Sequence, residues 1–244
     1  MNVISVIIPA KNEQDNILRT IEEIRRAFDR HGFSFEIIVV NDGSTDKTAE
    51  TVEQIAGKDF RIRLAVNKPP FGFGNAIKKG LDVFRGNYAI VAMADSSDDP
   101  EDMVRYVEKL QEGYDCCFGA RWVKGSDVQG YPKIKYILNR IFNWGVSLLF
   151  GLHYQDVTNA FKAYSRKAIE GIKPVLSRHF NITVELPLKA IVRGYSYTVI
   201  PVNWKERRIG RTGFKLQEMG SRYMFIILYV LLEKLLCGSD YKKQ

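Results

Sequence analysis

The chain has 244 residues, of which 45% are apolar, 12% aromatic and 26% charged. This composition is that of a globular protein long enough for one large domain, and it excludes disordered, collagen-like and disulfide-scaffold classes. The three cysteines are Cys116, Cys117 and Cys237. They make neither a disulfide framework nor a four-ligand zinc site, so a reducing compartment fits best.

The formal net charge of +8 is unevenly divided along the chain. Residues 1–115 carry 15 Lys or Arg and 20 Asp or Glu, whereas residues 116–244 carry 21 and 8. A basic half predicts an anionic partner: nucleic acid, anionic lipid or a phosphorylated substrate. Nothing resembles a nucleic-acid-binding module, and the basic residues are dispersed among apolar helices. We therefore expect a phosphate ligand and a membrane surface, and no nucleic acid.

Strands and helices alternate over the first 120 residues. The apolar start of the chain lacks a basic region and a cleavage site, so it predicts a strand and not a signal peptide. Repeated strand–helix units predict an α/β fold with an open, mostly parallel sheet, which binds ligands at the carboxyl ends of its strands. The predicted strands are 5–8, 35–40, 61–66 and 88–93, and the predicted helices begin near 17, 46, 76 and 100.

The second half is less regular. Apolar spacing predicts a long helix over 133–150, in which Trp144 and Phe150 are expected to pack, then a helix over 182–192 and a strand over 195–202. The last segment, 216–236, predicts a helix whose central apolar run covers ten residues, 223–232. A spanning helix needs about 20 apolar residues. This helix is expected to pack on the domain, bind a membrane partner, or lie in the lipid interface.

Polar residues follow the predicted strands, where ligands are expected. Asn12 and Glu13 follow the first strand, and Asp42 follows the second, where it is placed to bind a base or ribose or to form an Asx-type turn. Gly72 and Gly74 open a helix, so they allow phosphate to approach the backbone or simply make a turn.

An acidic segment follows the fourth strand. Asp95, Asp98 and Asp99 precede Pro100. Clustered carboxylates at a strand end predict a hard divalent cation, Mg²⁺ or Mn²⁺, bridging to substrate phosphates. The alternative is helix capping, because aspartate is favoured at a helix N-terminus.

In combination, these motifs resemble the GT-A family 2 glycosyltransferases, most closely those that use dolichol or polyprenyl phosphate. The resemblance covers about residues 3–216. It rests on VIIPAKNE, EIIVVNDGSTDKT, the Gly72–Ala76 helix start, the acidic segment before Pro100-Glu101, GARWV (119–123), DVTNAFKAY (156–164), WKER (204–207), and Gly210, Thr212 and Lys215-Leu216. The family's Asp-x-Asp metal motif is altered here, so either it has shifted to Asp95 and Asp98 or metal binding is weakened.

This resemblance implies a GT-A fold and an inverting transfer of sugar from a UDP- or GDP-linked donor. It assigns the nucleoside to Pro9, Ala10, Asn12, Glu13 and Asp42, and the donor phosphates to the Gly72/Gly74 turn and Lys215. Asp95 and Asp98 would hold the metal, and Arg121 and Arg207 would clamp phosphate oxygens. The resemblance also implies a nucleotide-sugar half at 1–120, an acceptor half at 121–214 and a docking segment at 215–244.

Three functions remain open from the sequence. An ionised polyprenyl phosphate attacks without a general base, whereas a hydroxyl acceptor needs one, for which Asp156 and Glu185 are the candidates. The third possibility is a sugar-nucleotide-binding subunit that has lost catalysis. For the first function we expect the protein on the cytoplasmic face of a membrane.

Overall fold

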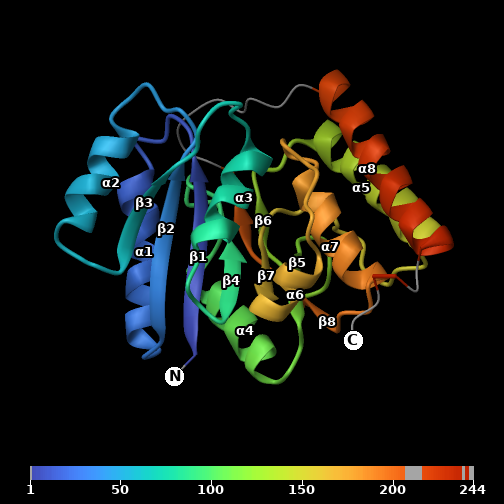
Figure 1. The fold of residues 1–244 in the computed structure, drawn as a ribbon, viewed down its shortest axis with the longest axis horizontal. Helices are drawn as coiled ribbons and strands as arrows, with labels where there is room; N and C mark the ends of the chain where they lie inside the picture. The colour runs from blue at the N-terminus through green and yellow to red at the C-terminus, as the bar shows by residue number, and fades with distance from the viewer. Residues whose placement is uncertain (1, 207–215, 238–239, 242–244) are drawn as a thin grey trace.

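The computed structural model describes residues 2–206, 216–237 and 240–241, and it shows a seven-stranded sheet between two layers of helices (Figure 1). The strand order is β3-β2-β1-β4-β7-β5-β8, and β7 is antiparallel to its neighbours. The strands of this sheet are β1 Val3–Ala10, β2 Ser34–Asn41, β3 Ile62–Val66, β4 Tyr88–Val91, β5 Cys116–Ala120, β7 Lys162–Ser165 and β8 Tyr197–Pro201. Two short strands, β6 Val128–Gln129 and β9 Trp204–Lys205, pair separately.

Helices cover both faces of the sheet because its central strands are apolar on both sides. In β1, Ile7 packs in one hydrophobic cluster and Ile8 in the other. One face is covered by α1 Ile17–Arg30, α2 Thr48–Ala56 and α4 Pro100–Gln111. The other face is covered by α3 Phe73–Val83, α5 Lys133–Phe150, α6 Arg166–Gly171, α7 Ile182–Val192 and α8 Leu216–Leu236.

Most predicted elements are confirmed, and three long helices match their predicted bounds (133–150, 182–192 and 216–236). The fourth strand is shorter than predicted and ends at Val91. Beyond it the chain turns, because the Met93 N–H donates to the Asp98 carboxylate at 2.9 Å and not to a strand.

The expectation that Trp144 packs in the core is wrong, although Phe150 is buried as expected. Trp144 lies on α5 with 60% of its surface exposed. Only the C-terminal part of α5 reaches the core, through Val146 and Phe150, so most of its apolar stripe has no covering element among the described residues.

The last helix packs on the domain along one side. Ile226, Ile227 and Val230 of α8 are buried, and Glu233 forms a buried ion pair with Arg193 at the end of α7. Figure 1 shows α8 beside α5, where Phe142 and Tyr223 contact each other with ring centroids 5.4 Å apart. Among the described residues, no helix combines the length and the apolar character needed to cross a bilayer.

Candidate functional site

The carboxyl ends of β1 and β2 are joined by hydrogen bonds between the loops that follow them. The Asn12 N–H donates to Ser44 Oγ at 3.1 Å, and Asn12 Oδ1 accepts from the Thr45 N–H at 2.8 Å. Asn12 has a positive φ of 56°, a conformation that asparagine tolerates better than most residues. The N–H of Glu13 donates to Thr48 at the start of α2. The two loops therefore form one connected rim, which begins directly after Pro9 and Ala10 at the end of β1.

Asp42 links this rim to the glycine turn. It is buried, and its Oδ1 accepts from the Asn67 side chain at 2.7 Å and from the Gly72 N–H at 3.0 Å. The Asx-type turn is made instead by Asn41, whose Oδ1 accepts from the Ser44 N–H. Asp42 therefore connects the loop after β2 with the start of α3.

The glycine turn is packed against a loop from the second half of the chain. The Gly74 N–H donates to the Arg178 carbonyl at 3.0 Å. A Cβ at Gly74 would lie 2.7 Å from the Arg178 carbonyl carbon, closer than real side chains approach. Glycine is therefore needed at position 74 because the backbone of the 177–179 loop lies so close to it. The sequence offered no signal for this loop, because it lies about a hundred residues away.

Glu185 supports the same loop from below. Its side chain is fully buried on α7, where it pairs with Lys189 at 2.7 Å. Its two oxygens accept the N–H groups of Leu176 and Ser177, each at 2.7 Å. All of these bonds hold the carboxylate in place beneath the loop that contacts the glycine turn.

The acidic segment after β4 contains two buried carboxylates, Asp95 and Asp98, and one carboxylate, Asp99, that caps α4. Asp99 accepts from the Glu101 N–H and caps α4, so the capping alternative applies to this residue. Asp95 and Asp98 are 8% and 7% exposed. Burial raises the pKa of Asp98 to about 7. The hydrogen bond from Met93 and the charge of Arg121 oppose this rise, and the charge of Asp95 adds to it.

Arg121, immediately after β5, is held by Asp156, which precedes β7 at the same edge of the sheet. Asp156 accepts the Arg121 backbone N–H and its Nε–H at 2.9 Å each, and its Nη2–H at 2.8 Å. Burial disfavours the charged guanidinium, but Asp156 outweighs it and keeps the pKa of Arg121 above its ordinary value. Near this pair, Nζ of buried Lys162 donates to the carbonyls of Val157, Asn159 and Thr183.

Two aromatic side chains, Trp122 and Tyr131, lie beside the Arg121 guanidinium, and Tyr136 and Trp204 pack against these two rings. Trp122 and Trp204 belong to motifs that carry the family resemblance, whereas Tyr131 and Tyr136 had no assigned role. Trp204 also forms a backbone bridge with Asp98, which brings β9 across the acidic segment.

The predicted residues fall into two groups around the carboxyl edge. The loops with Asn12, Glu13, Asp42, Gly72 and Gly74 meet at β1 and β2. Asp98 lies close enough to Asp95 and Arg121 for both charges to affect its pKa, and Arg121 is paired with Asp156. Glu185 lies apart, beneath the 177–179 loop. Arg207 and Lys215 fall outside the described residues.

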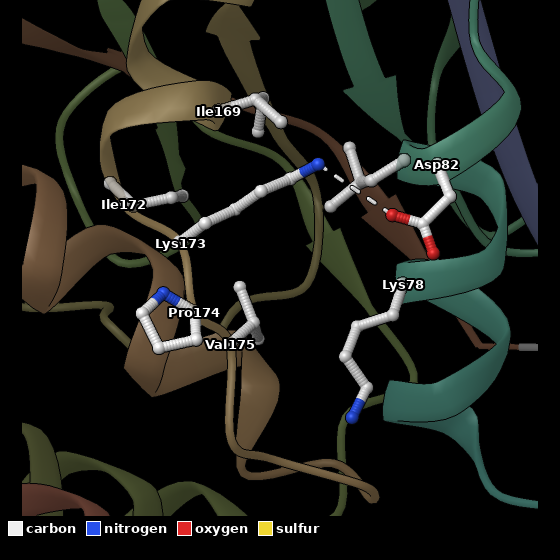
Figure 2. Close-up of a pocket in the computed structure, with 8 residues that line it drawn as sticks. Lys78, Asp82, Ile169, Ile172, Lys173, Pro174 and Val175 are labelled. Carbon is white, nitrogen blue, oxygen red and sulfur yellow. Dashed lines mark ion pairs between the residues drawn. The ribbon is translucent and has the colours of Figure 1, made fainter.

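A groove of about 380 Å³ lies between α3 and the segment at the end of α6. Figure 2 shows its polar residues, Lys78 and Asp82 on α3 and Lys173 on the opposite wall, with the Lys173–Asp82 ion pair of 3.6 Å between the two walls. None of the predicted site residues lines this groove.

The acidic segment fits a divalent cation that also binds substrate phosphates. Within the described part of the chain, no three His, Cys, Asp or Glu side chains gather into a complete metal site. Mg²⁺ is nevertheless commonly held by one or two carboxylates, with water and substrate phosphates as its other ligands. Asp95 and Asp98 provide that donor set, and a cation would offset both the burial that raises the pKa of Asp98 and the smaller effect of the Asp95 charge.

Comparisons with known proteins identify the family of the chain. The family model described as glycosyl transferase family 2 matches residues 5–173. The polyprenol monophosphomannose synthase of Mycolicibacterium smegmatis is 30% identical over 84% of this chain and 78% of that protein. The dolichol-phosphate mannosyltransferase of Pyrococcus furiosus is 27% identical over 87% of this chain and 59% of that protein.

Among solved structures, the chain resembles glucosyl-3-phosphoglycerate synthase from Mycobacterium tuberculosis. The TM-score is 0.69 at 21% identity, and the match covers 96% of this chain and 80% of that one. That enzyme has been crystallised with UDP and Mn²⁺ or Mg²⁺. The structural match confirms the predicted GT-A fold, and the family match extends over more than half of the sequence: the chain belongs to glycosyl transferase family 2 and is a glycosyltransferase.

Proposed function

We propose that the protein transfers a sugar, with inversion, from a nucleoside diphosphate sugar to a polyprenyl phosphate such as dolichyl or undecaprenyl phosphate. The observation that carries this proposal is the Arg121–Asp156 pair. A buried guanidinium, held by a carboxylate beside the acidic segment, is suited to bind a phosphate oxygen. The similarity to a polyprenol monophosphomannose synthase over most of both chains supports the same acceptor class.

The hydrogen bonds and ion pairs of the two candidate bases favour a phosphate acceptor over a hydroxyl. Asp156 is bound to Arg121, and Glu185 is bound to Lys189 and to two backbone N–H groups. A general base must reach the proton that it removes, and both carboxylates are already engaged in these bonds. A phosphomonoester has its second pKa near about 6, so it is largely ionised at neutral pH and attacks without a base.

For the donor, we assign the nucleoside to the rim formed by the loops after β1 and β2. Pro9, Ala10, Asn12, Glu13 and Asp42 line or support this rim. The Gly72/Gly74 turn would approach the donor phosphates together with Lys215, and Arg207 would assist Arg121. These assignments extend the nucleotide-sugar half over residues 1–120 and the acceptor half over 121–214.

Asp95 and Asp98 would hold Mg²⁺ or Mn²⁺ against the donor diphosphate. When bound, the ion would neutralise the negative charge that develops on the leaving nucleoside diphosphate. The Arg121 guanidinium, oriented by Asp156, holds the acceptor phosphate close to the donor. Positioning and charge stabilisation therefore account for most of the expected rate enhancement.

We further propose that the protein works at the cytoplasmic face of a membrane, bound through α5 and the 215–244 segment. Both helices expose apolar side chains: Ile134, Ile137, Ile141, Trp144 and Leu148 on α5, and Met224, Phe225, Leu228, Leu232 and Leu235 on α8. Exposed Lys133 and Lys135 lie at the start of α5. Apolar residues flanked by basic ones are the pattern of helices that lie in an anionic lipid interface.

Vesicle flotation tests the membrane proposal. We expect binding to vesicles that contain phosphatidylglycerol, weaker binding to neutral phosphatidylcholine vesicles, and loss of binding in Leu148→Asp. The matched control is Phe60→Asp, because Phe60 is 91% exposed in the α2–β3 connection. Equal binding by both variants, or no binding by the unaltered protein, would contradict a lipid surface as the partner.

A transfer assay tests the reaction. The protein is incubated with UDP- and GDP-sugars, Mg²⁺ or Mn²⁺, and a polyprenyl phosphate in detergent. We expect labelled sugar in the lipid phase only with metal present, and none with Asp95→Ala. Transfer to a polyprenol in preference to its phosphate would instead support a hydroxyl acceptor, and full activity of Asp95→Ala would refute the metal assignment.

A further inference from the structure

Four aromatic side chains form a continuous cluster, called here the aromatic track, which consists of Trp204, Tyr131, Trp122 and Tyr136. The ring centroids are 5.2 Å apart for Trp204 and Tyr131, 5.0 Å for Tyr131 and Trp122, and 4.7 Å for Trp122 and Tyr136. All three contacts are edge-to-face, the geometry that aromatic pairs favour. The four residues come from β9, the segment between β6 and α5, the loop after β5, and α5 itself.

The two ends of the track reach different parts of the molecule. Trp204 forms a backbone bridge with Asp98, in the acidic segment. Tyr136 lies in the first turn of α5, between Ile134 and Ile137 of the exposed apolar face. The track therefore connects the acidic segment to the surface that we propose contacts lipid.

Arg121 lies beside the middle of the track. Its guanidinium carbon is 5.8 Å from the centre of the Trp122 ring and 5.5 Å from that of Tyr131. The buried indole N–H of Trp122 has no hydrogen-bond partner among the residues that the structure describes. Buried polar groups are nearly always paired, so this donor is suited to an oxygen atom of a ligand held beside Arg121.

We propose that the aromatic track binds the first isoprene units of the acceptor, while Arg121 and the Trp122 N–H bind its phosphate. This inference rests on the proposed function and names the residues that recognise the acceptor's hydrocarbon. A guanidinium alone donates hydrogen bonds to any phosphate and does not distinguish one that carries a hydrocarbon chain. Apolar rings that continue from it toward a lipid-facing helix favour a phosphate that carries a hydrocarbon chain.

The first test is kinetic and uses a soluble acceptor, so that membrane binding does not contribute. Farnesyl phosphate is the acceptor, and Tyr136→Ala is compared with Tyr114→Ala. The two tyrosines are 40% and 38% exposed, but Tyr114 lies before β5 at the opposite edge of the sheet. Alanine is the best helix former, so Tyr136→Ala is expected to fold.

Loss of one aromatic contact corresponds to a factor of about 2 to 12 in affinity. We therefore expect the acceptor KM to rise by about that factor in Tyr136→Ala, with the donor KM unchanged, and neither constant to change in Tyr114→Ala. A raised donor KM with an unchanged acceptor KM would refute the inference and would assign the track to the donor sugar.

The second test measures binding without turnover. The chain has three tryptophans, Trp122, Trp144 and Trp204, so Trp144→Phe leaves only the two in the track. We expect farnesyl phosphate to change the emission of this variant in a saturable way, inorganic phosphate to change it little, and Tyr136→Ala in the same background to weaken binding. Equal responses to both phosphates would refute recognition of the hydrocarbon.

The two levels of the proposal fail in different ways. No transfer to any isoprenyl phosphate, together with saturable farnesyl phosphate binding at the track, would refute the proposed reaction and leave the binding site supported. Normal transfer with an unchanged acceptor KM in Tyr136→Ala would refute the aromatic track and leave the proposed reaction supported.

Discussion

Asp156 binds Arg121 through the side chain and the backbone together, across 35 positions of sequence. The carboxylate uses both oxygens, at 2.8 and 2.9 Å from the guanidinium nitrogens. The pair is almost fully buried, and its geometry is the two-point fork that arginine forms with carboxylates. Asp156 therefore acts as a positioning residue for Arg121.

Substitution of Asp156 tests this role. Asp156→Asn leaves a buried guanidinium without its counter-charge, so we expect a loss of stability of about 3–5 kcal/mol in urea unfolding. In the folded fraction the acceptor KM should rise while the donor KM stays unchanged, because Arg121 loses its orientation. If Asp156 were instead a general base, kcat would fall at an unchanged acceptor KM and the pH–rate profile would lose its acidic limb.

The raised pKa of Asp98 predicts how stability depends on pH. The folded-state pKa of about 7 lies above the ordinary value of 3.8, so the folded protein binds this proton more tightly than the unfolded chain. The stabilisation of the folded state by this proton is fully present below pH ~4 and is lost as the pH rises to about 7. The free energy of unfolding falls by up to about 4 kcal/mol over this range.

Asp98→Asn removes this titration. In the presence of a chelator, we expect the variant to be more stable than the unaltered protein at pH 8 and similar to it at pH 4, as measured by urea unfolding. Added Mg²⁺ or Mn²⁺ should stabilise the unaltered protein at pH 8 and not the variant. A constant difference between the two proteins from pH 4 to 8 would show that Asp98 does not titrate in this range.

Two glycines in helices form a matched pair for testing the glycine turn. Gly74→Ala places a methyl group 2.7 Å from the backbone of the 177–179 loop, so the loop must shift. We expect lower stability and a higher donor KM. Gly145→Ala, within α5 with nothing inside 4 Å, should stabilise the protein by about 0.5–1 kcal/mol and leave both KM values unchanged. Equal effects of the two substitutions would contradict the role of the turn.

The ion pair between Arg193 and Glu233 tests how firmly α8 is attached. Its oxygens lie 2.6 and 2.9 Å from the guanidinium nitrogens, and both side chains are buried. Glu233→Gln should cost about 3–5 kcal/mol and make α8 sensitive to limited proteolysis. The control Glu23→Gln breaks an exposed pair on α1 and should cost less than about 1 kcal/mol. An unchanged proteolysis pattern in Glu233→Gln would mean that apolar packing alone holds α8.

The periodicity of apolar residues was sufficient to predict the α/β class, the mostly parallel sheet and the bounds of three long helices. The same pattern placed Asn12, Asp42 and Asp95 at strand ends, and these ends meet because parallel strands present their carboxyl ends at one edge. These features depend only on the spacing of apolar and polar residues along the chain, and the sequence shows that spacing directly. Arg121 was assigned only through the family resemblance, because the strand that precedes it, β5, was not predicted.

The tertiary structure decided what each polar side chain binds and which apolar faces are covered. The sequence made Asp156 and Glu185 equal candidates for a general base. In the structure Asp156 is paired with Arg121, and Glu185 binds the backbone of Leu176 and Ser177. Helical spacing predicted that Trp144 packs in the core, but only the C-terminal end of α5 reaches the core and Trp144 is exposed. A local sequence pattern determines which face of a helix is apolar. Contacts between residues far apart in sequence determine whether that face is buried, and whether a carboxylate is already paired.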